Sequence, residues 1–490
     1  MRKRIISVIL ALIIVLGCAA PAFAAEQETA KSTYNGYPFV LVRGMDFNGL
    51  YCNLGTDEEQ NCFKGVDAGS VIRVLFRTIG SGIIHWSWDS AVDELNAYLN
   101  DIMGLMACDK NGNSKYDVSV KDYPTSLADY PETWDMGDGD EMGILKAAVE
   151  KYGPENVYYY NYDWRLDPFL HAVRINKLIN TAIKETGKKK VNLVCCSMGG
   201  IETVSYMYKY GSSKLNRVVF QSSTFCGTHV TTDVLRGMIS IDSYNLYMFA
   251  YQKLGAGNRP LQILFDILYR TKVFDAVSDL ANKLIPKIKD RVYEGFLSGT
   301  FGTMPSVWAL VLPEGYNAAI EYMFGGKEDE YADFIALTEK YQKMSKARDK
   351  MLKKAEANGT SICVCAGYNT ACVPVYEGGG CNGDSVLEAD RMLGGANVAA
   401  LGHTLGDNYK AKNPSRLSPD RVVDLSDIIF PDSTWALNGA PHVGASYGTE
   451  SSDFLFWLVD YKGKVTVRSN ERYPQFMNSS TFGETLRPWE

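Results

Sequence analysis

The sequence predicts an α/β fold with a mostly parallel sheet that helices cover on both faces. Short apolar runs that end at polar or glycine-rich turns are typical of buried strands, and helical patterns lie between several of them. Alternation of this kind favours a parallel sheet between two layers of helices. The predicted strands are residues 37–42, 157–162, 190–196, 217–221 and 360–366.

The helical patterns between these strands carry recognisable end signals. Helices are predicted at residues 90–103, 140–152 and 172–185, and Gly153 and Gly187 follow the last two, as expected for residues that end a helix. In the third helix, Val173, Ile175, Leu178, Ile179 and Ile183 are predicted to lie near one face.

The alternation stops in the middle of the chain. Residues 226–358 show helical patterns and no convincing strand, and the strand pattern resumes at residue 360. The resumption favours a helical insertion, a lid, within one α/β core over a separate helical domain. The predicted division is a leader at 1–24, core at 25–225 and 359–490, and the lid between them.

Composition excludes several classes of protein. Of 490 residues, 46% are hydrophobic and 22% charged, which argues against a disordered, collagen-like or coiled-coil chain. The net charge of −7 offers no basic surface, so no nucleic-acid partner is expected. A single uncharged apolar run approaches membrane-spanning length, and it lies at the N-terminus.

The N-terminus has the pattern of an export signal. Three basic residues at positions 2–4 precede an apolar stretch, and Ala22-Phe23-Ala24 matches a signal-peptidase site. Cleavage after Ala24 leaves 47 basic and 57 acidic residues, a net charge of −10. Two alternatives stay open: lipidation at Cys18, within a segment that resembles a lipoprotein box, or a retained signal anchor. We expect an exported protein, secreted or held at the cell surface.

Export permits disulfides. The leader removes Cys18 and leaves ten cysteines, among which Cys52–Cys62 and Cys372–Cys381 are the best local pairs. Cys195 and Cys196 are adjacent in a predicted strand and are expected to point to opposite faces of the sheet. The cysteine spacings do not form a convincing zinc site.

The sharpest motif is the segment VCCSMGG at residues 194–200, where a predicted strand runs into Ser197 and a helical segment follows. This is the strand–turn–helix context of the G-x-S-x-G nucleophile motif. Gly199 fills the second glycine position, and Cys195 replaces the first. The motif predicts Ser197 as a nucleophile and the Met198 N–H as an oxyanion donor. A second donor is expected from the loop after the first strand: Met45, with Asp46 as the alternative.

A serine nucleophile needs a histidine base and a carboxylate that orients it, and in this context they follow in the order Ser, Asp, His. His442 lies in a turn-rich loop before a helical stretch at residues 452–461 and is the predicted base, with His403 as the alternative. Asp384 follows the fifth predicted strand and is the predicted acid. The other acids considered are Asp390, Asp407 and Asp424. The order excludes His85 and His171, and His229 is expected to be structural.

Three segments resemble the lecithin:cholesterol acyltransferase-like family of α/β-hydrolases. They are the Y-D-W-R-x-x-P-like segment at residues 162–168, Gly-Asp-Ser-Val at 383–386, and the P-S-x-x-x-L-P-like stretch at 301–313. The resemblance implies the α/β-hydrolase fold and acyl-ester chemistry on lipids, as a lipase, phospholipase or acyltransferase. In the first segment, it implies that Asp163 and Arg165 brace the loop beside the active site.

The resemblance also implies contact with membrane surfaces. Cys52 and Cys62 are placed to close a short loop similar to the family's membrane-contacting loop. The apolar stretch at residues 83–88 is a second candidate for lipid contact, or it packs under the lid.

Residues 109–117 partly match a calcium-binding EF-hand loop. Asp109, Asn111, Asn113 and Asp117 supply oxygen ligands at positions 1, 3, 5 and 9. Ser114 replaces the usual glycine, and Val120 stands where a bidentate glutamate is required. Two interpretations stay open, a calcium loop or a polar turn; no other cofactor is expected.

The sequence therefore supports two functional hypotheses. The first is an exported serine hydrolase or O-acyltransferase that acts on lipid or other acyl esters through Ser197, Asp384 and His442. The second, motivated by Cys195 in place of glycine, is a non-catalytic lipid- or glycan-binding protein on a hydrolase-like fold.

Overall fold

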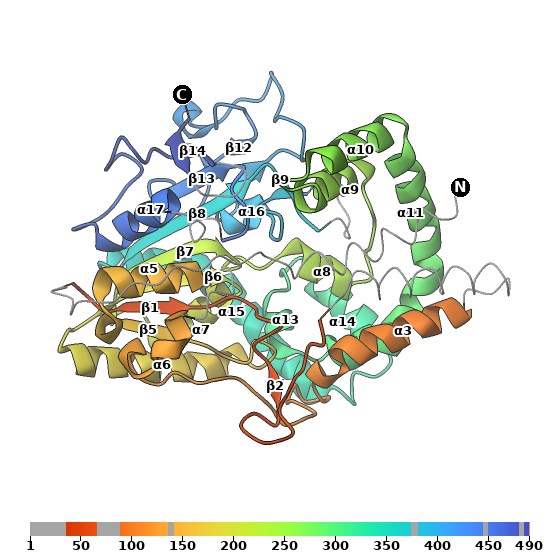
Figure 1. The fold of residues 1–490 in the computed structure, drawn as a ribbon, viewed down its shortest axis with the longest axis horizontal. Coiled ribbons are helices and arrows are strands. Elements are labelled where there is room, and N and C mark those ends of the chain that lie inside the picture. Colours follow the sequence, from red (N-terminus) through yellow and green to blue (C-terminus); the bar gives the residue numbers. More distant parts are fainter. Residues whose placement is uncertain are drawn as a thin grey trace.

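A computed structural model describes residues 36–65, 89–135, 142–373, 381–443, 449–479 and 485–489. Its centre is an eight-stranded sheet with the order β15-β14-β13-β8-β7-β6-β1-β5 (Figure 1). All neighbouring strands in it are parallel except β14 and β15. The predicted α/β class with a mostly parallel sheet is confirmed. Along the chain the strands are β1 (Phe39–Val42), β5 (Val157–Tyr160), β6 (Val191–Ser197), β7 (Leu215–Ser223), β8 (Ser361–Tyr368), β13 (Thr434–Asn438), β14 (Phe476–Ser479) and β15 (Leu486–Pro488).

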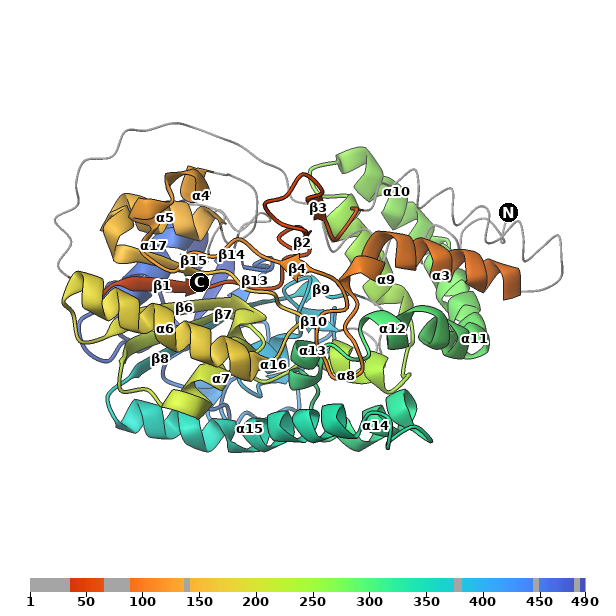
Figure 2. The ribbon, with the colours of Figure 1, turned by 90° about the horizontal axis from the view of Figure 1, so that it is seen from below.

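Helices cover both faces of this sheet, as Figure 2 shows. One hydrophobic cluster joins Phe39 of β1 to α5 (Met142–Tyr152) and α17 (Thr449–Asp460). Another joins Val40 of β1 to helices on the other face, which are α6 (Pro168–Thr186), α7 (Gly199–Tyr210) and α15 (Ala332–Ala357). Cys195 belongs to the second cluster and Cys196 to the first, so the alternation predicted for this pair is confirmed.

Local signals define the ends of α6. The Asp167 side chain accepts the Phe169 N–H at 2.8 Å, Pro168 occupies the first turn, and Gly187 follows the helix with a φ of 67°. Val173, predicted on the buried face with Ile175, is instead 42% exposed. Val173 and Ile175 are two positions apart, and a step of two positions turns the side-chain direction by about 200° around the helix axis. These two side chains therefore point to nearly opposite sides of α6.

Helices fill the segment between β7 and β8, and no strand occurs in residues 224–360, whose backbone is described throughout. Figure 1 shows α9, α10 and α11 at the periphery of the molecule. The helices are α8 (His229–Leu235), α9 (Ser243–Phe249), α10 (Arg259–Arg270), α11 (Val273–Val292), α12 (Ser298–Thr300), α13 (Pro305–Ala309), α14 (Tyr316–Phe324) and α15, with π-helical turns at Ala250–Leu254 and Tyr293–Leu297.

Shorter elements surround the main sheet. Small sheets pair β2 (Tyr51–Cys52) with β3 (Gln60–Asn61) and β4 (Val118–Ser119), β9 (Thr370–Ala371) with β10 (Asn382–Gly383), and β11 (Asn397–Val398) with β12 (Val423–Asp424). The remaining helices are α3 (Asp89–Met103), α4 (Pro131–Asp135), α16 (Ala389–Met392) and the 3-10 turns Gly104–Met106, Leu127–Asp129, Pro154–Asn156 and Pro414–Arg416.

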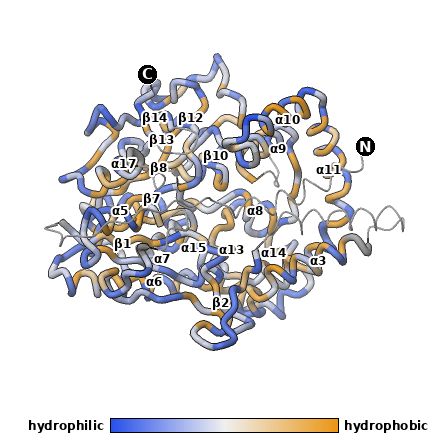
Figure 3. The backbone as a smooth tube through the Cα atoms, in the orientation of Figure 1, coloured by the Kyte–Doolittle hydropathy of each residue, from blue (hydrophilic) through white to orange (hydrophobic). Residues whose placement is uncertain are grey.

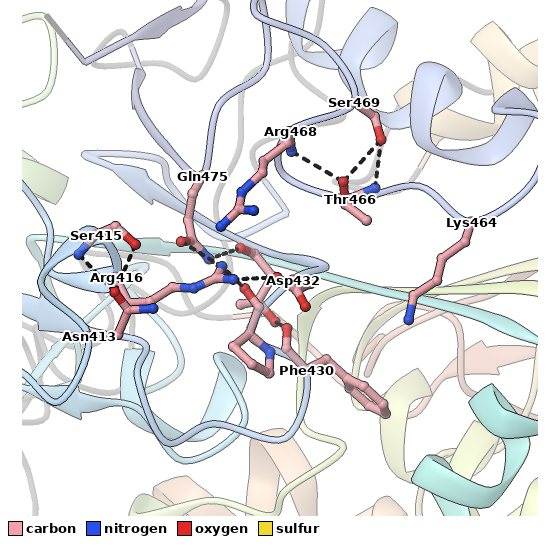
Figure 4. Close-up of polar contacts among 12 residues, drawn as sticks. Asn413, Ser415, Arg416, Phe430, Asp432, Lys464, Thr466, Arg468, Ser469 and Gln475 are labelled. Carbon is pink, nitrogen blue, oxygen red and sulfur yellow. Dashed lines mark hydrogen bonds and ion pairs between the residues drawn. The ribbon is translucent and has the colours of Figure 1, made fainter.

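A buried arginine ties the last segments of the chain together (Figure 4). The Arg416 guanidinium donates to the Pro431 carbonyl and to Gln475 Oε1, the latter at 2.9 Å, and it pairs with Asp432. Gln475 in turn donates to the Thr434 carbonyl at 3.0 Å. These bonds fix the segments that lead into β13 and β14.

Two of the predicted features lie outside the described residues. These are the leader at 1–24, including Cys18, and the apolar stretch at 83–88. None of the described helices is both long and apolar enough to cross a membrane. Cys52 and Cys62 are thiols with their sulfur atoms 3.2 Å apart, longer than a disulfide bond, and Cys372 and Cys381 are also thiols. Both disulfides stay predictions.

Candidate active site

Ser197 is the last residue of β6 and lies in a strained turn before α7. Its φ of 49° falls in the left-handed region, which is uncommon for a residue with a side chain. The Ser197 carbonyl accepts the backbone N–H and the hydroxyl of Thr224, at 2.9 and 3.1 Å. The turn therefore has the strand–turn–helix form that the sequence motif predicts, and Thr224 holds it from the neighbouring strand end.

The two glycines after Met198 let α7 lie close to the sheet. A Cβ at Gly199 would come within 2.5 Å of the carbonyl oxygens of Val42 and Arg43. A Cβ at Gly200 would come within 1.8 Å of Ser223 Oγ. Neither position accommodates a side chain, and Gly199 brings the turn at Ser197 directly against the loop that follows β1.

Cys195, the departure from the glycine pattern, is fully buried inside the sheet. Its thiol donates to the Val219 carbonyl at 3.5 Å, and burial raises its pKa to about 12. Cys195 is therefore a neutral, packed thiol two residues before Ser197.

The loop predicted to supply an oxyanion donor is held by the Tyr-Asp-Trp-Arg segment. Tyr162 donates its hydroxyl to the Arg43 carbonyl at 3.1 Å, and the Trp164 indole donates to the Asp46 carbonyl at 3.0 Å. These bonds fix the backbone on both sides of Met45. Met198, the other predicted donor, occupies the N-cap position of α7.

Asp163 and Arg165 of the same segment form a buried ion pair at 2.5 Å. Arg165 also donates to the Met106 carbonyl at 2.7 Å and to Ser114 Oγ at 3.0 Å. The pair therefore braces the loop of residues 106–114. That this pair braces a loop beside the active site, as the resemblance implies, stays a prediction.

The structure brings Asp384 and His442 together from loops that follow neighbouring strands. Asp384 Oδ2 lies 2.7 Å from His442 Nδ1, with Asp384 fully buried and His442 8% exposed. The other oxygen, Oδ1, accepts the N–H groups of Val386 and Leu387 at 3.1 and 2.9 Å. This is the arrangement in which a carboxylate fixes the tautomer and orientation of an imidazole.

Gly367, in β8, makes this approach sterically feasible. A Cβ there would meet the Ala440 carbonyl at 2.1 Å and the Asp384 Cβ at 3.0 Å. The strands β6, β7, β8 and β13 are consecutive and parallel, so Ser197, Asp384 and His442 all follow carboxyl ends at one edge of the sheet. No local pattern indicates the role of Gly367, because its contacts come from segments remote along the chain.

The alternative residues lie elsewhere. His403 and Asp407 are exposed, and Asp424 accepts the Tyr409 hydroxyl at 2.7 Å.

Two other histidines pair with carboxylates away from His442. His229 Nε2 lies 3.2 Å from Asp390 Oδ2, in a pair separate from His442. His171 is buried with its Nδ1 3.0 Å from Glu202 Oε2. Of these acids, Asp384 is the one that contacts His442.

Glu388 is a buried carboxyl group that sequence reasoning missed. Its Oε1 accepts the Val230 N–H of α8 at 2.8 Å, and its Oε2 has no hydrogen-bond partner in the described part of the chain. Burial, together with the nearby charge of Asp390, raises the pKa of Glu388 to about 7. It links the helical segment to the loop that carries Asp384.

The loop at residues 109–117 is closed by its own hydrogen bonds. Asp109 Oδ1 accepts the N–H groups of Asn111 and Asn113, at 2.8 and 2.9 Å. Burial opposes ionisation, but these amide donors outweigh it and lower the pKa of Asp109. In the described ranges, no group of three His, Cys, Asp or Glu side chains is arranged to hold a metal ion. Calcium binding by Asp109, Asn111, Asn113 and Asp117 stays a prediction.

Comparisons with known proteins give no family assignment. No protein-family model matches the chain, and no curated protein matches it. Among solved structures, a chain of the crystal structure of the Tle4-Tli4 complex is 11% identical with a TM-score of 0.25, and the alignment covers 68% of this chain and 75% of that chain. This similarity is too low to show a shared family or function.

Proposed function

We propose that the protein is an exported serine hydrolase or O-acyltransferase that acts on acyl esters, with lipids as the substrate class. The observation that carries the proposal is the pairing of two features at one edge of the sheet. Ser197 occupies a positive-φ turn between β6 and α7, and His442 contacts a buried Asp384 at 2.7 Å. The lipid class rests on the resemblance stated above.

The proposed reaction has two halves. His442 Nε2, the ring nitrogen opposite the Asp384 contact, accepts the Ser197 proton while Oγ attacks the ester carbonyl. The Met198 and Met45 N–H groups stabilise the oxyanion. The ester C–O bond breaks as His442 protonates the leaving alcohol, and a seryl ester remains. Water, or a second alcohol, gives its proton to His442 and attacks the seryl ester. The bond between the acyl carbon and Ser197 Oγ then breaks as His442 returns the proton to Oγ.

A fluorophosphonate probe tests this proposal directly, because it phosphonylates an activated serine. We expect the purified protein to be labelled and the Ser197→Ala variant to be unlabelled at equal thermal stability. A folded wild-type protein that is not labelled would contradict the proposal and favour the second hypothesis, a lipid- or glycan-binding protein. Product analysis with a phospholipid, with and without an alcohol acceptor, then separates hydrolysis from acyl transfer.

A further inference from the structure

Helix α10 has hydrophobic side chains on two opposite faces, and Figure 3 shows much of it coloured as hydrophobic. The inner face packs within the helical segment: Phe265, Leu268 and Tyr269 contact the cluster around Phe274, and the rings of Tyr269 and Tyr247 stack at 4.3 Å. This packing accounts for one face only.

The outer face exposes three large aliphatic side chains. Ile263, Leu264 and Ile267 are 46%, 47% and 52% exposed, and helical spacing places them in one stripe with no charged residue among them. A contiguous stripe of this kind on a helix at the periphery is typical of an interaction surface, whereas single exposed apolar residues are ordinary.

The charges around this face are positive, in contrast to the rest of the chain. Residues 253–275, which include α10 and the segments on either side of it, contain four Lys or Arg and two Asp or Glu, although the whole chain carries −7. Arg259 and Arg270 stand exposed at the two ends of α10. Both acids are engaged within the protein, because Asp266 accepts the Tyr247 hydroxyl at 2.6 Å and Asp275 pairs with Lys272 at 3.0 Å.

We propose that the outer face of α10 docks on an anionic lipid bilayer. An amphipathic helix of this kind inserts its aliphatic stripe at the level of the headgroups, while arginines at its ends pair with lipid phosphates. Association with a second copy is disfavoured, because an antiparallel pair of α10 helices would place Arg259 of one against Arg270 of the other.

Contacts within the fold connect α10 to the segment that carries Asp384. Helix α9, the packing partner of α10, contacts β9, and Gln252 beside it bonds the Asn369 carbonyl and the Ala371 N–H at 3.4 and 2.8 Å. Strand β9 pairs with β10, which ends at Gly383, one residue before Asp384.

Vesicle flotation tests the proposal in the Ser197→Ala background, where no hydrolysis alters the lipid. We expect the exported protein to float with vesicles of phosphatidylcholine and phosphatidylglycerol, and less with phosphatidylcholine alone. Replacing Ile263 and Ile267 by Glu weakens binding by about tenfold or more, because charges on the inserted face oppose insertion. Replacing Arg259 and Arg270 by Glu removes the preference for anionic lipid.

The matched control is Leu170→Glu on α6, where the leucine is 57% exposed and lies outside the helical segment. We expect it to bind like the parent protein, with circular dichroism showing that all variants fold. Equal binding by the α10 and α6 variants overturns the proposal, as does a parent protein that binds no vesicle. A dimer that the α10 variants dissociate also overturns it, because the occupant is then a second copy. Failure of fluorophosphonate labelling alone leaves this inference intact.

Discussion

At the scale of single residues, the two carboxylate oxygens of Asp384 make different contacts, and a substitution can change one while it keeps the other. One oxygen accepts two backbone N–H groups and the other contacts His442. An asparagine preserves the first contact but presents an amide N–H₂ to the imidazole, which favours the wrong tautomer. We expect Asp384→Asn to lower the rate of fluorophosphonate labelling by about 10³–10⁴-fold with little change in melting temperature.

The control for this substitution is Asp390→Asn, because Asp390 lies in the same segment but pairs with His229. Its labelling rate should stay within about tenfold of the wild-type rate. Equal loss in both variants would show that Asp384 has no specific role in activating Ser197.

The buried carboxyl group of Glu388 should make the unfolding free energy of the protein depend on pH. Its folded-state pKa of about 7 lies above its ordinary value of 4.5, so the folded state holds the proton more tightly than the unfolded state. The stabilisation is complete below pH 4.5 and is lost as the pH rises toward 7. Glu388→Gln keeps a neutral group that accepts the Val230 N–H, so its unfolding free energy should fall less over this range. Urea unfolding at about pH 5, 6, 7 and 8 measures the difference, and equal slopes would contradict the prediction.

At the scale of elements, the turn at Ser197 depends on the close approach of α7 to β1. A methyl group at Gly199 would lie 2.5 Å from two backbone carbonyls that cannot rotate away. We expect Gly199→Ala to displace the start of α7, lower the unfolding free energy by about 1–3 kcal/mol and reduce Ser197 labelling. Gly299→Ala is the control, because no atom lies within 4 Å of the place that its new methyl group would take. Wild-type labelling by Gly199→Ala would show that this contact does not shape the site.

Some of the strands and helices could be predicted from the sequence and others could not. Strands β1, β5, β6, β7 and β8 and helices α5, α6 and α7 are predictable, because their apolar runs and end signals are local. Strands β13, β14 and β15 escape prediction, since polar residues or a proline interrupt their apolar residues, unlike the runs of β1 and β5, and their partners are set by the fold. At the site, Ser197 follows from a local motif. The contacts of Gly367 and Glu388 join distant segments and have no local pattern.

At the scale of the whole molecule, the helical segment divides a sheet whose two parts are interleaved. Strand β8, from beyond the segment, pairs with β7 on one side and β13 on the other. Arg217 of β7 adds a second link, because its buried guanidinium donates to the carbonyls of Leu458, Val459 and Gly463 around the end of α17. Neither part of the core is complete without the other.

This arrangement predicts that the two parts of the core unfold together. Trp164 reports on the part before the helical segment and Trp435 on the part after it, and both are buried. In a variant that keeps one of these two as its only tryptophan among the eight, the urea midpoint from fluorescence should equal the midpoint from far-UV circular dichroism, because β7 and β8 share one hydrogen-bonded ladder. Arg217→Ala, which removes the guanidinium bonds to these three carbonyls, should shift both midpoints down by an equal amount, equivalent to about 3 kcal/mol. Two separate midpoints would show instead that the parts fold as independent units and that the links through β8 and Arg217 do not couple them.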